Sequence, residues 1–142
     1  MNATTTRNGK SYACVVLWAV VLLYCALLCV GALIPRDARY NAFVRMVPGG
    51  ALMTHAVAYG ILALLLCAAL GANNTRNVRV AVLAVILSAA FGGILELMQM
   101  FTPSRKAGLA DYAADFPGIL LACSAWLAWR YLWGFRKRGL AA

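Results

Sequence analysis

Acidic side chains are scarce in this chain of 142 residues, where four Asp and Glu stand against thirteen Lys and Arg. Charged residues of both signs make up only 12% of the sequence, whereas 64% of the residues are hydrophobic. A soluble domain carries roughly 25% charged and 45–50% apolar residues. The net charge of +9 therefore does not indicate nucleic-acid binding, and we expect no nucleic-acid partner, because the composition is that of a membrane protein.

Cysteine motifs for metal binding or redox chemistry are also lacking. All five cysteines lie inside apolar runs, namely Cys14, Cys25, Cys29, Cys67 and Cys123. Thiols in such runs pack as small hydrophobic groups and do not form the disulfide framework of a small secreted domain. No CxxC or Cys/His ligand spacing occurs. The sequence therefore assigns no metal site and no cofactor.

Long apolar runs account for most of the chain. A helix needs about 20 mostly apolar residues to cross the hydrocarbon core, and such runs lie near residues 12–33, 52–70, 80–101 and 109–132. They do not alternate between apolar and polar residues as barrel strands do. The first run is longer than the hydrophobic region of a signal peptide, so we expect it to be retained. We predict one all-α membrane domain over residues 1–142, an integral membrane four-helix bundle with up-down topology.

The distribution of Lys and Arg predicts an orientation for this multi-pass chain. One predicted side carries basic residues in the N-terminal segment, the second loop and the C-terminal segment, with GFRKRG at the end of the last helix. Short loops rich in Lys and Arg stay in the cytoplasm. We therefore expect both termini to be cytoplasmic and the chain to contact membrane lipids, with an extracytoplasmic side formed by the first and third loops.

Polar residues near the predicted helix ends form the candidate site. They occur in pairs three or four residues apart, and each pair shares one helix face: His55 and Tyr59, Glu96 and Gln99, and Asp111 and Asp115. In an up-down bundle these ends lie on the same side. The spacing therefore predicts one polar cluster that is reached from the extracytoplasmic face.

Structural roles compete with functional ones for several of these residues. Asp111 fits a helix N-cap as well as a binding group, because a carboxylate there meets free N–H groups. Ionisable groups within a span cost about 2.5–3.5 kcal/mol on insertion scales, so Glu96 and Asp115 indicate mutual pairing or a function. Arg105 in the following loop is the candidate counter-charge, since its guanidinium can bind a carboxylate or a phosphate.

Two segments resemble the VanZ-like family. ELMQMFTPSRKAGLADYAADFPGILLA is similar to the family signature, and HAVAYGIL fits its His and Tyr four residues apart. The matching residues are His55, Tyr59, Glu96, Gln99, Arg105, Asp111 and Gly118, within a VanZ-like region expected over about residues 36–133. The chain departs from the family in having Ala51 and Leu52 where an Asp-Lys pair is common, and Asp115 where many relatives have Asn.

The resemblance implies a protein of the bacterial cell envelope, located in the cytoplasmic (inner) membrane. The family takes its name from a membrane protein associated with resistance to the glycopeptide teicoplanin, so a link to antibiotic resistance is an expectation here. The leading interpretation is that the polar cluster binds an amphiphilic or anionic lipid-linked ligand, with Arg105 holding the anion.

Two other classes of function stay open. An enzyme acting on a polyprenyl phosphate or a phospholipid headgroup would use His55, Glu96 and Asp115 as acids and bases. The sequence leans against it because no nucleophile motif or metal-ligand pattern accompanies them. A proton-coupled carrier is disfavoured, since the cytoplasmic half of the predicted spans has almost no ionisable residue.

Overall fold

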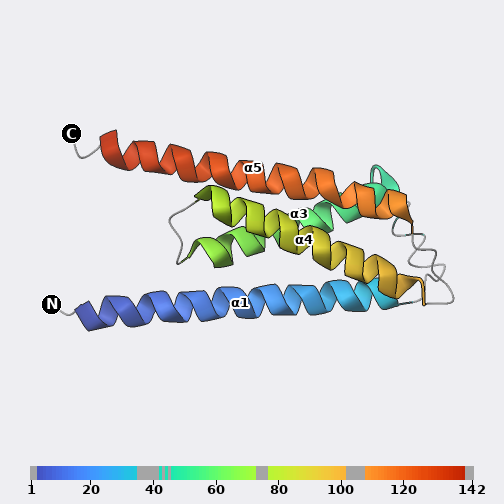
Figure 1. Cartoon of the computed structure of the whole chain (residues 1–142), viewed down its shortest axis with the longest axis horizontal. Coiled ribbons are helices and arrows are strands. Elements are labelled where there is room, and N and C mark those ends of the chain that lie inside the picture. Colours follow the sequence, from blue (N-terminus) through green and yellow to red (C-terminus); the bar gives the residue numbers. More distant parts are fainter. Residues whose placement is uncertain are drawn as a thin grey trace.

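Four helices make up the part of the chain that the structure, a computed structural model, describes: residues 3–34, 42, 44, 46–72, 77–101 and 108–139. They are α1 (Ala3–Leu33), α3 (Gly50–Gly71), α4 (Asn77–Gln99) and α5 (Leu109–Gly139), and these residues include no strand. Figure 1 shows successive helices running in opposite directions, so that α1 begins and α5 ends at the same end of the bundle. The all-α, up-down bundle is therefore confirmed.

Several helix bounds differ from those of the predicted apolar runs, because an apolar run and a helix need not end at the same residue. α1 begins before the predicted residue 12, and α5 continues beyond 132, because a helix can extend past its apolar part into polar sequence. α4 ends at Gln99 although the apolar run continues. Met100 and Phe101 instead form a turn, in which each N–H donates to the carbonyl three residues earlier.

Three helical segments are long and apolar enough to cross a membrane: Tyr12–Leu33, Gly50–Gly71 and Asn77–Gln99. Their large apolar side chains lie mainly on the outside; Leu23, for example, is 73% exposed. An apolar exterior of this kind suits lipid rather than water. α5 is not among the three; its first half contains Asp111 and Asp115, and its second half contains Arg130. That α5 also crosses the membrane stays a prediction.

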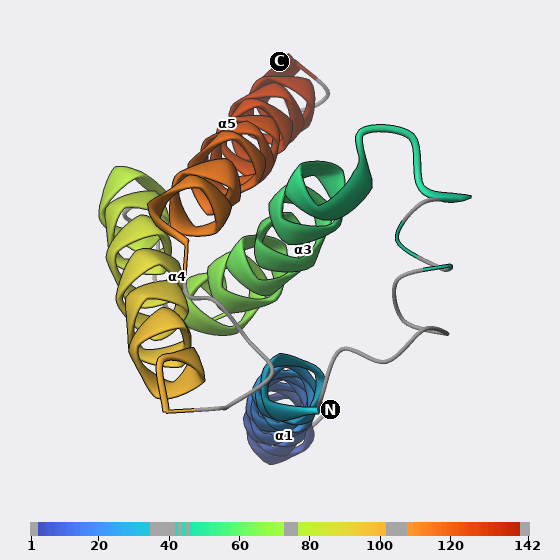
Figure 2. The ribbon, with the colours of Figure 1, turned by 90° about the vertical axis from the view of Figure 1, so that its right-hand side faces the viewer.

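The interior is built around α3. This helix packs most extensively against α5 and also contacts α1 and α4, whereas α1 contacts only α3 and α4 among the described helices. Figure 2 shows α1 set apart from α5 on the far side of α3 and α4. Small and medium side chains form the buried contacts, including Ala63 and Cys67 of α3, Ala84 of α4 and Ile119 of α5. Small residues at these positions let the helices approach closely.

A glycine turn sets where α3 begins. Gly49 and Gly50 have φ angles of 85° and 61°, which side chains with a Cβ rarely adopt. Thr54 then donates a hydrogen bond from Oγ1 to the Gly50 carbonyl at 3.0 Å. This start places His55 in the second turn of α3, at the same end of the bundle as the last turn of α4 and the first turn of α5 (Figure 1).

Candidate functional site

The polar residues that the sequence singled out come from three helix ends. His55 lies near the start of α3, Glu96 and Gln99 in the last turn of α4, and Asp111 and Asp115 in the first two turns of α5. We call these residues, together with Tyr59, the polar cluster. The interior of the cluster is shielded from solvent, because Asp115 is fully buried and Gln99 is only 3% exposed.

A polar contact in the cluster joins α3 to α5. His55 Nδ1 lies 3.0 Å from Asp115 Oδ1, and with Asp115 ionised the ring N–H donates to the carboxylate. The His55 side chain is 15% exposed, whereas that of Asp115 is 1% exposed. A buried carboxylate that holds one ring nitrogen fixes the orientation of the imidazole and leaves Nε2 for another partner.

Close backbone packing makes this contact possible. A Cβ at Gly118 would overlap the carbonyl of Ala56, and a Cβ at Gly60 would lie 3.2 Å from the Gly118 carbonyl oxygen. Ala56 follows His55 directly, and Gly118 lies one turn after Asp115. The near contact of the two backbones therefore brings the imidazole and the carboxylate within hydrogen-bonding distance.

Glu96 joins the end of α4 to the start of α5. Its Oε2 accepts a hydrogen bond from the Gly108 N–H at 3.2 Å. The other oxygen, Oε1, is buried and has no hydrogen-bond partner within the described part of the chain. Glu96 as a whole is 9% exposed. A buried carboxylate oxygen without a partner is costly, and Gln99 Oε1 and Asp115 Oδ2 of the cluster are in the same state.

Gly92 allows the side chains of Asp115 and Tyr59 to pack closely against α4. A Cβ at Gly92 would lie 2.7 Å from Asp115 Oδ2 and 3.1 Å from the Tyr59 ring. The Tyr59 ring in turn stacks near the His55 ring, with 6.3 Å between the centroids. The sequence analysis did not single out Gly92, although its position one turn before Glu96, on the same helix face, is a signal that links it to the cluster.

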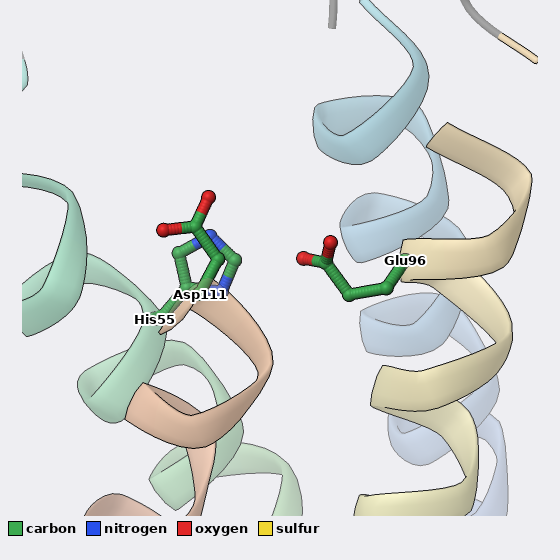
Figure 3. Close-up of side chains that lie close together, drawn as sticks. All are labelled: His55, Glu96 and Asp111. Carbon is green, nitrogen blue, oxygen red and sulfur yellow. The ribbon is translucent and has the colours of Figure 1, made fainter. Parts of the chain in front are cut away.

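His55, Glu96 and Asp111 approach one another across the three helices. One ligand-type atom from each lies within 4.8 Å of the other two, and Figure 3 shows the Glu96 side chain reaching from α4 toward the other two. An imidazole and two carboxylates are groups that bind divalent metals. The sequence assigned no metal site because these ligands are distant in the chain and form no local spacing.

Two cavities flank the cluster. One, of about 180 Å³, lies between α1, α3 and α4 and is lined by the polar groups of Thr54, His55, Tyr59 and Gln99 together with apolar residues of α1. The other, of about 640 Å³, lies between α4 and α5. Its lining consists of Gly93, Glu96, Leu97, Met100, Gly108, Leu109 and Tyr112. We call this second cavity the α4–α5 groove. Its walls are mostly apolar, and Glu96 provides a carboxylate on one of them.

Arg105, the predicted holder of an anion, lies outside the described residues, so its place relative to the cluster is not part of the site described above. The structure brings together the other predicted residues, with Asp111 and Asp115 both close to His55. Their role in binding a ligand stays a prediction.

No protein-family model matches this chain, and neither a curated protein nor a solved structure does. The site is therefore interpreted from its own geometry, and the resemblance to the VanZ-like family stays a prediction.

Proposed function

We propose that this membrane protein binds an amphiphilic, lipid-linked molecule, with its headgroup at the polar cluster and its apolar chain along the α4–α5 groove. The observation that carries the proposal is the position of Glu96. Its carboxylate is part of the cluster and also lines a groove whose other walls are largely apolar. A site with apolar walls and a few placed polar groups suits a ligand of mixed polarity.

The charges of the polar cluster and of the adjoining loop restrict the class of lipid headgroup that can bind. The described cluster contains three carboxyl groups and one imidazole, which accept hydrogen bonds from hydroxyl or amide groups. In the sequence, Arg105 and Lys106 follow Glu96 closely and supply positive charge in the adjoining loop. A sugar-bearing or hydroxylated lipid phosphate would use both: Arg105 binds the phosphate, and the carboxylates bind the hydroxyls. A polyprenyl-phosphate cell-wall intermediate belongs to this class. A lipidated glycopeptide carries no phosphate and would use only the carboxylates, which bind its hydroxyl and amide groups.

The location belongs to the same proposal. Three apolar helices make this a membrane protein, and the bias of Lys and Arg supports both termini in the cytoplasm of a bacterial cell. The polar cluster, at the opposite end of the bundle from the start of α1, would then face the outside of the inner membrane. Membership of the VanZ-like family, and with it a link to teicoplanin resistance, is part of this proposal.

A pair of matched lipids tests the binding function. Purified protein in detergent is titrated with a polyprenyl phosphate and with the corresponding polyprenol, which lacks the phosphate. We expect the phosphate to bind more tightly and Arg105→Lys to weaken its binding roughly tenfold, or about 1.4 kcal/mol, since lysine lacks the planar fork. Cys25→Ala in α1 serves as the control.

Equal affinity for both lipids, or equal binding by the wild type, Arg105→Lys and Glu96→Gln, would contradict the proposal. A variant that binds less only because it unfolds is recognised by its lower thermal stability without lipid.

One observation favours an enzyme as the second candidate. The buried Asp115 carboxylate orients His55 in the way a catalytic base is oriented, with Nε2 left free to take a proton. Glu96 lies close enough to act as the acid. Hydrolysis of the phosphoanhydride bond of a lipid-linked diphosphate fits this arrangement, with water as the nucleophile and inorganic phosphate as the leaving group. Release of phosphate from a polyprenyl diphosphate by the wild type, lost in His55→Gln, would favour the enzyme; binding without turnover favours the binding function.

A further inference from the structure

Three side chains that can bind a metal meet where α3, α4 and α5 converge. We propose that His55, Glu96 and Asp111 form a site for one divalent transition-metal ion of the Zn²⁺ class. Their ligand atoms lie within 4.8 Å of one another, and Figure 3 shows the Glu96 carboxylate directed toward the other two side chains. This inference concerns the metal alone and does not depend on the amphiphile proposed above.

The donor set and its spacing suit such an ion. Imidazole nitrogen and carboxylate oxygen both ligate Zn²⁺, whereas Mg²⁺ prefers oxygen ligands and retains several waters. Around a tetrahedral ion with bonds of about 2.0–2.1 Å, the ligand atoms stand roughly 3.4 Å apart. The observed separations of up to 4.8 Å therefore need to close by at most about 1.4 Å. Side-chain rotation would have to supply this closure, with Glu96 keeping its hydrogen bond to the Gly108 N–H.

His55 is already oriented for ligation. Its Nδ1 donates to Asp115 Oδ1 at 3.0 Å, so Nε2 is the nitrogen that can bind a metal. Metal-binding histidines usually donate their other N–H to a carboxylate or a carbonyl, which fixes the tautomer and strengthens the ligand. Asp115 takes this supporting position and is itself fully buried. It is a positioning residue, since it touches the imidazole and is not one of the three ligands.

Glu96 supplies an independent observation. Its Oε2 is held by the Gly108 N–H, while Oε1 is buried with no hydrogen-bond partner in the described part of the chain. With the residue 9% exposed, water compensates little of the cost of leaving this oxygen unsatisfied. A bound cation would satisfy Oε1, and the Gly108 hydrogen bond would hold the carboxylate in place.

Three protein ligands leave a fourth position at a tetrahedral ion. Glu96 also lines the α4–α5 groove, so a ligand in that groove can reach the metal. Sites with three protein ligands and one open position are typical of metals that bind or activate a small group, such as water or a phosphate oxygen.

Zn²⁺ titration of the purified full-length chain tests the site, with calorimetry as the readout and no lipid ligand added. The affinity tag must contain no histidine. We expect one Zn²⁺ per chain, and Asp115→Asn to weaken binding by about 10–100-fold, as loss of a supporting partner does. Glu96→Gln and Asp111→Asn remove a ligand charge each and should weaken binding at least as much. Mg²⁺ at the same concentrations should not compete.

Thiols also bind Zn²⁺, so one control removes the two buried cysteines and a second, with Co²⁺, tests all five. A Cys67→Ala/Cys123→Ala double variant should bind Zn²⁺ as the wild type does, since the Sγ atoms lie in the apolar interior. Co²⁺ in place of Zn²⁺ should show no thiolate-to-metal charge-transfer absorption.

A measurement on the wild type keeps the proposal testable if a variant fails to fold. His55 is the single histidine of the chain, so ¹⁵N-histidine labelling reports on it alone. We expect Zn²⁺ to shift the Nε2 resonance strongly and to leave Nδ1 protonated. Absence of Zn²⁺ binding, a thiolate absorption band with Co²⁺, or an Nε2 resonance unmoved at saturating Zn²⁺ would each overturn the proposal.

Discussion

Gly118 of α5 lies against the carbonyl of Ala56 of α3, so close that a Cβ at position 118 would overlap it. The atoms that such a Cβ would meet are backbone atoms, which cannot rotate away as a side chain can. The two helices are therefore held at a separation that only glycine permits, and the His55–Asp115 hydrogen bond lies one turn further along this contact.

Gly118→Ala should therefore destabilise the protein, because α3 and α5 must move apart. Overpacking of this kind costs about 1–3 kcal/mol, which outweighs the gain of up to about 1 kcal/mol in helix propensity. Thermal unfolding in detergent measures the change. Gly93→Ala in α4 is the control, since its added Cβ would meet its nearest atom, in the Tyr112 ring, at an ordinary contact distance of 3.6 Å. Equal stability of the two variants would show that the helices are not in close contact.

The tautomer of His55 is a second prediction. Because Asp115 accepts a hydrogen bond from Nδ1, the neutral ring should carry its proton on Nδ1 in the metal-free protein. The ¹⁵N spectrum of the single histidine distinguishes the two tautomers directly. Asp115→Asn, which keeps the size of the side chain and removes its charge, should broaden or change this spectrum. An Nε2–H tautomer in the wild type would show that Nδ1 does not donate to Asp115.

Neighbouring glycines of α4 provide a matched pair for the third prediction. A Cβ at Gly92 would lie 2.7 Å from Asp115 Oδ2, whereas one at Gly93 would meet its nearest atom, in the Tyr112 ring, at 3.6 Å. Gly92→Ala should therefore displace the Asp115 carboxylate and shift the His55 ¹⁵N resonances, while Gly93→Ala leaves them unchanged. The same shift in both variants would indicate a general effect on α4 instead of a local contact at the cluster.

The helices could be predicted from the sequence, because runs of about 20 apolar residues leave few alternatives to membrane helices. Their ends were less predictable. Apolar residues continue to Phe101 although α4 ends at Gln99, since hydropathy reports burial in lipid and not the backbone hydrogen bonds that end a helix. Likewise α5 extends to Gly139, beyond residue 132, where the predicted apolar run ends.

The members of the polar cluster could be proposed from their spacing, but their pairing could not. Which carboxylate His55 meets depends on the rotation of α3 and α5 about their axes, and this is set by the close approach of Gly118 to Ala56. The Gly108 N–H that holds Glu96 is a backbone group and leaves no mark in the sequence. The approach of His55, Glu96 and Asp111 to within 4.8 Å of one another was not predicted, because the three come together only when three helices meet.

The last prediction concerns the side of the membrane on which the C-terminus lies. Its test also shows whether α5 crosses the membrane. Only three helical segments of the described residues meet the length and hydropathy expected of a span, yet α5 runs alongside α3 and ends where α1 begins (Figure 1). A helix that packs along a spanning helix shares its depth in the bilayer, so we expect α5 to cross as well. Four crossings place both termini on the same side, and the basic C-terminal segment favours the cytoplasm.

A fluorescent protein fused after Ala142 should therefore fluoresce in bacterial cells, and alkaline phosphatase at the same position should be inactive. Phosphatase fused within the third loop, after Phe101, is the control and should be active. If the phosphatase fused after Ala142 is active while the other fusion is not, the orientation is reversed. If both are active, α5 does not cross.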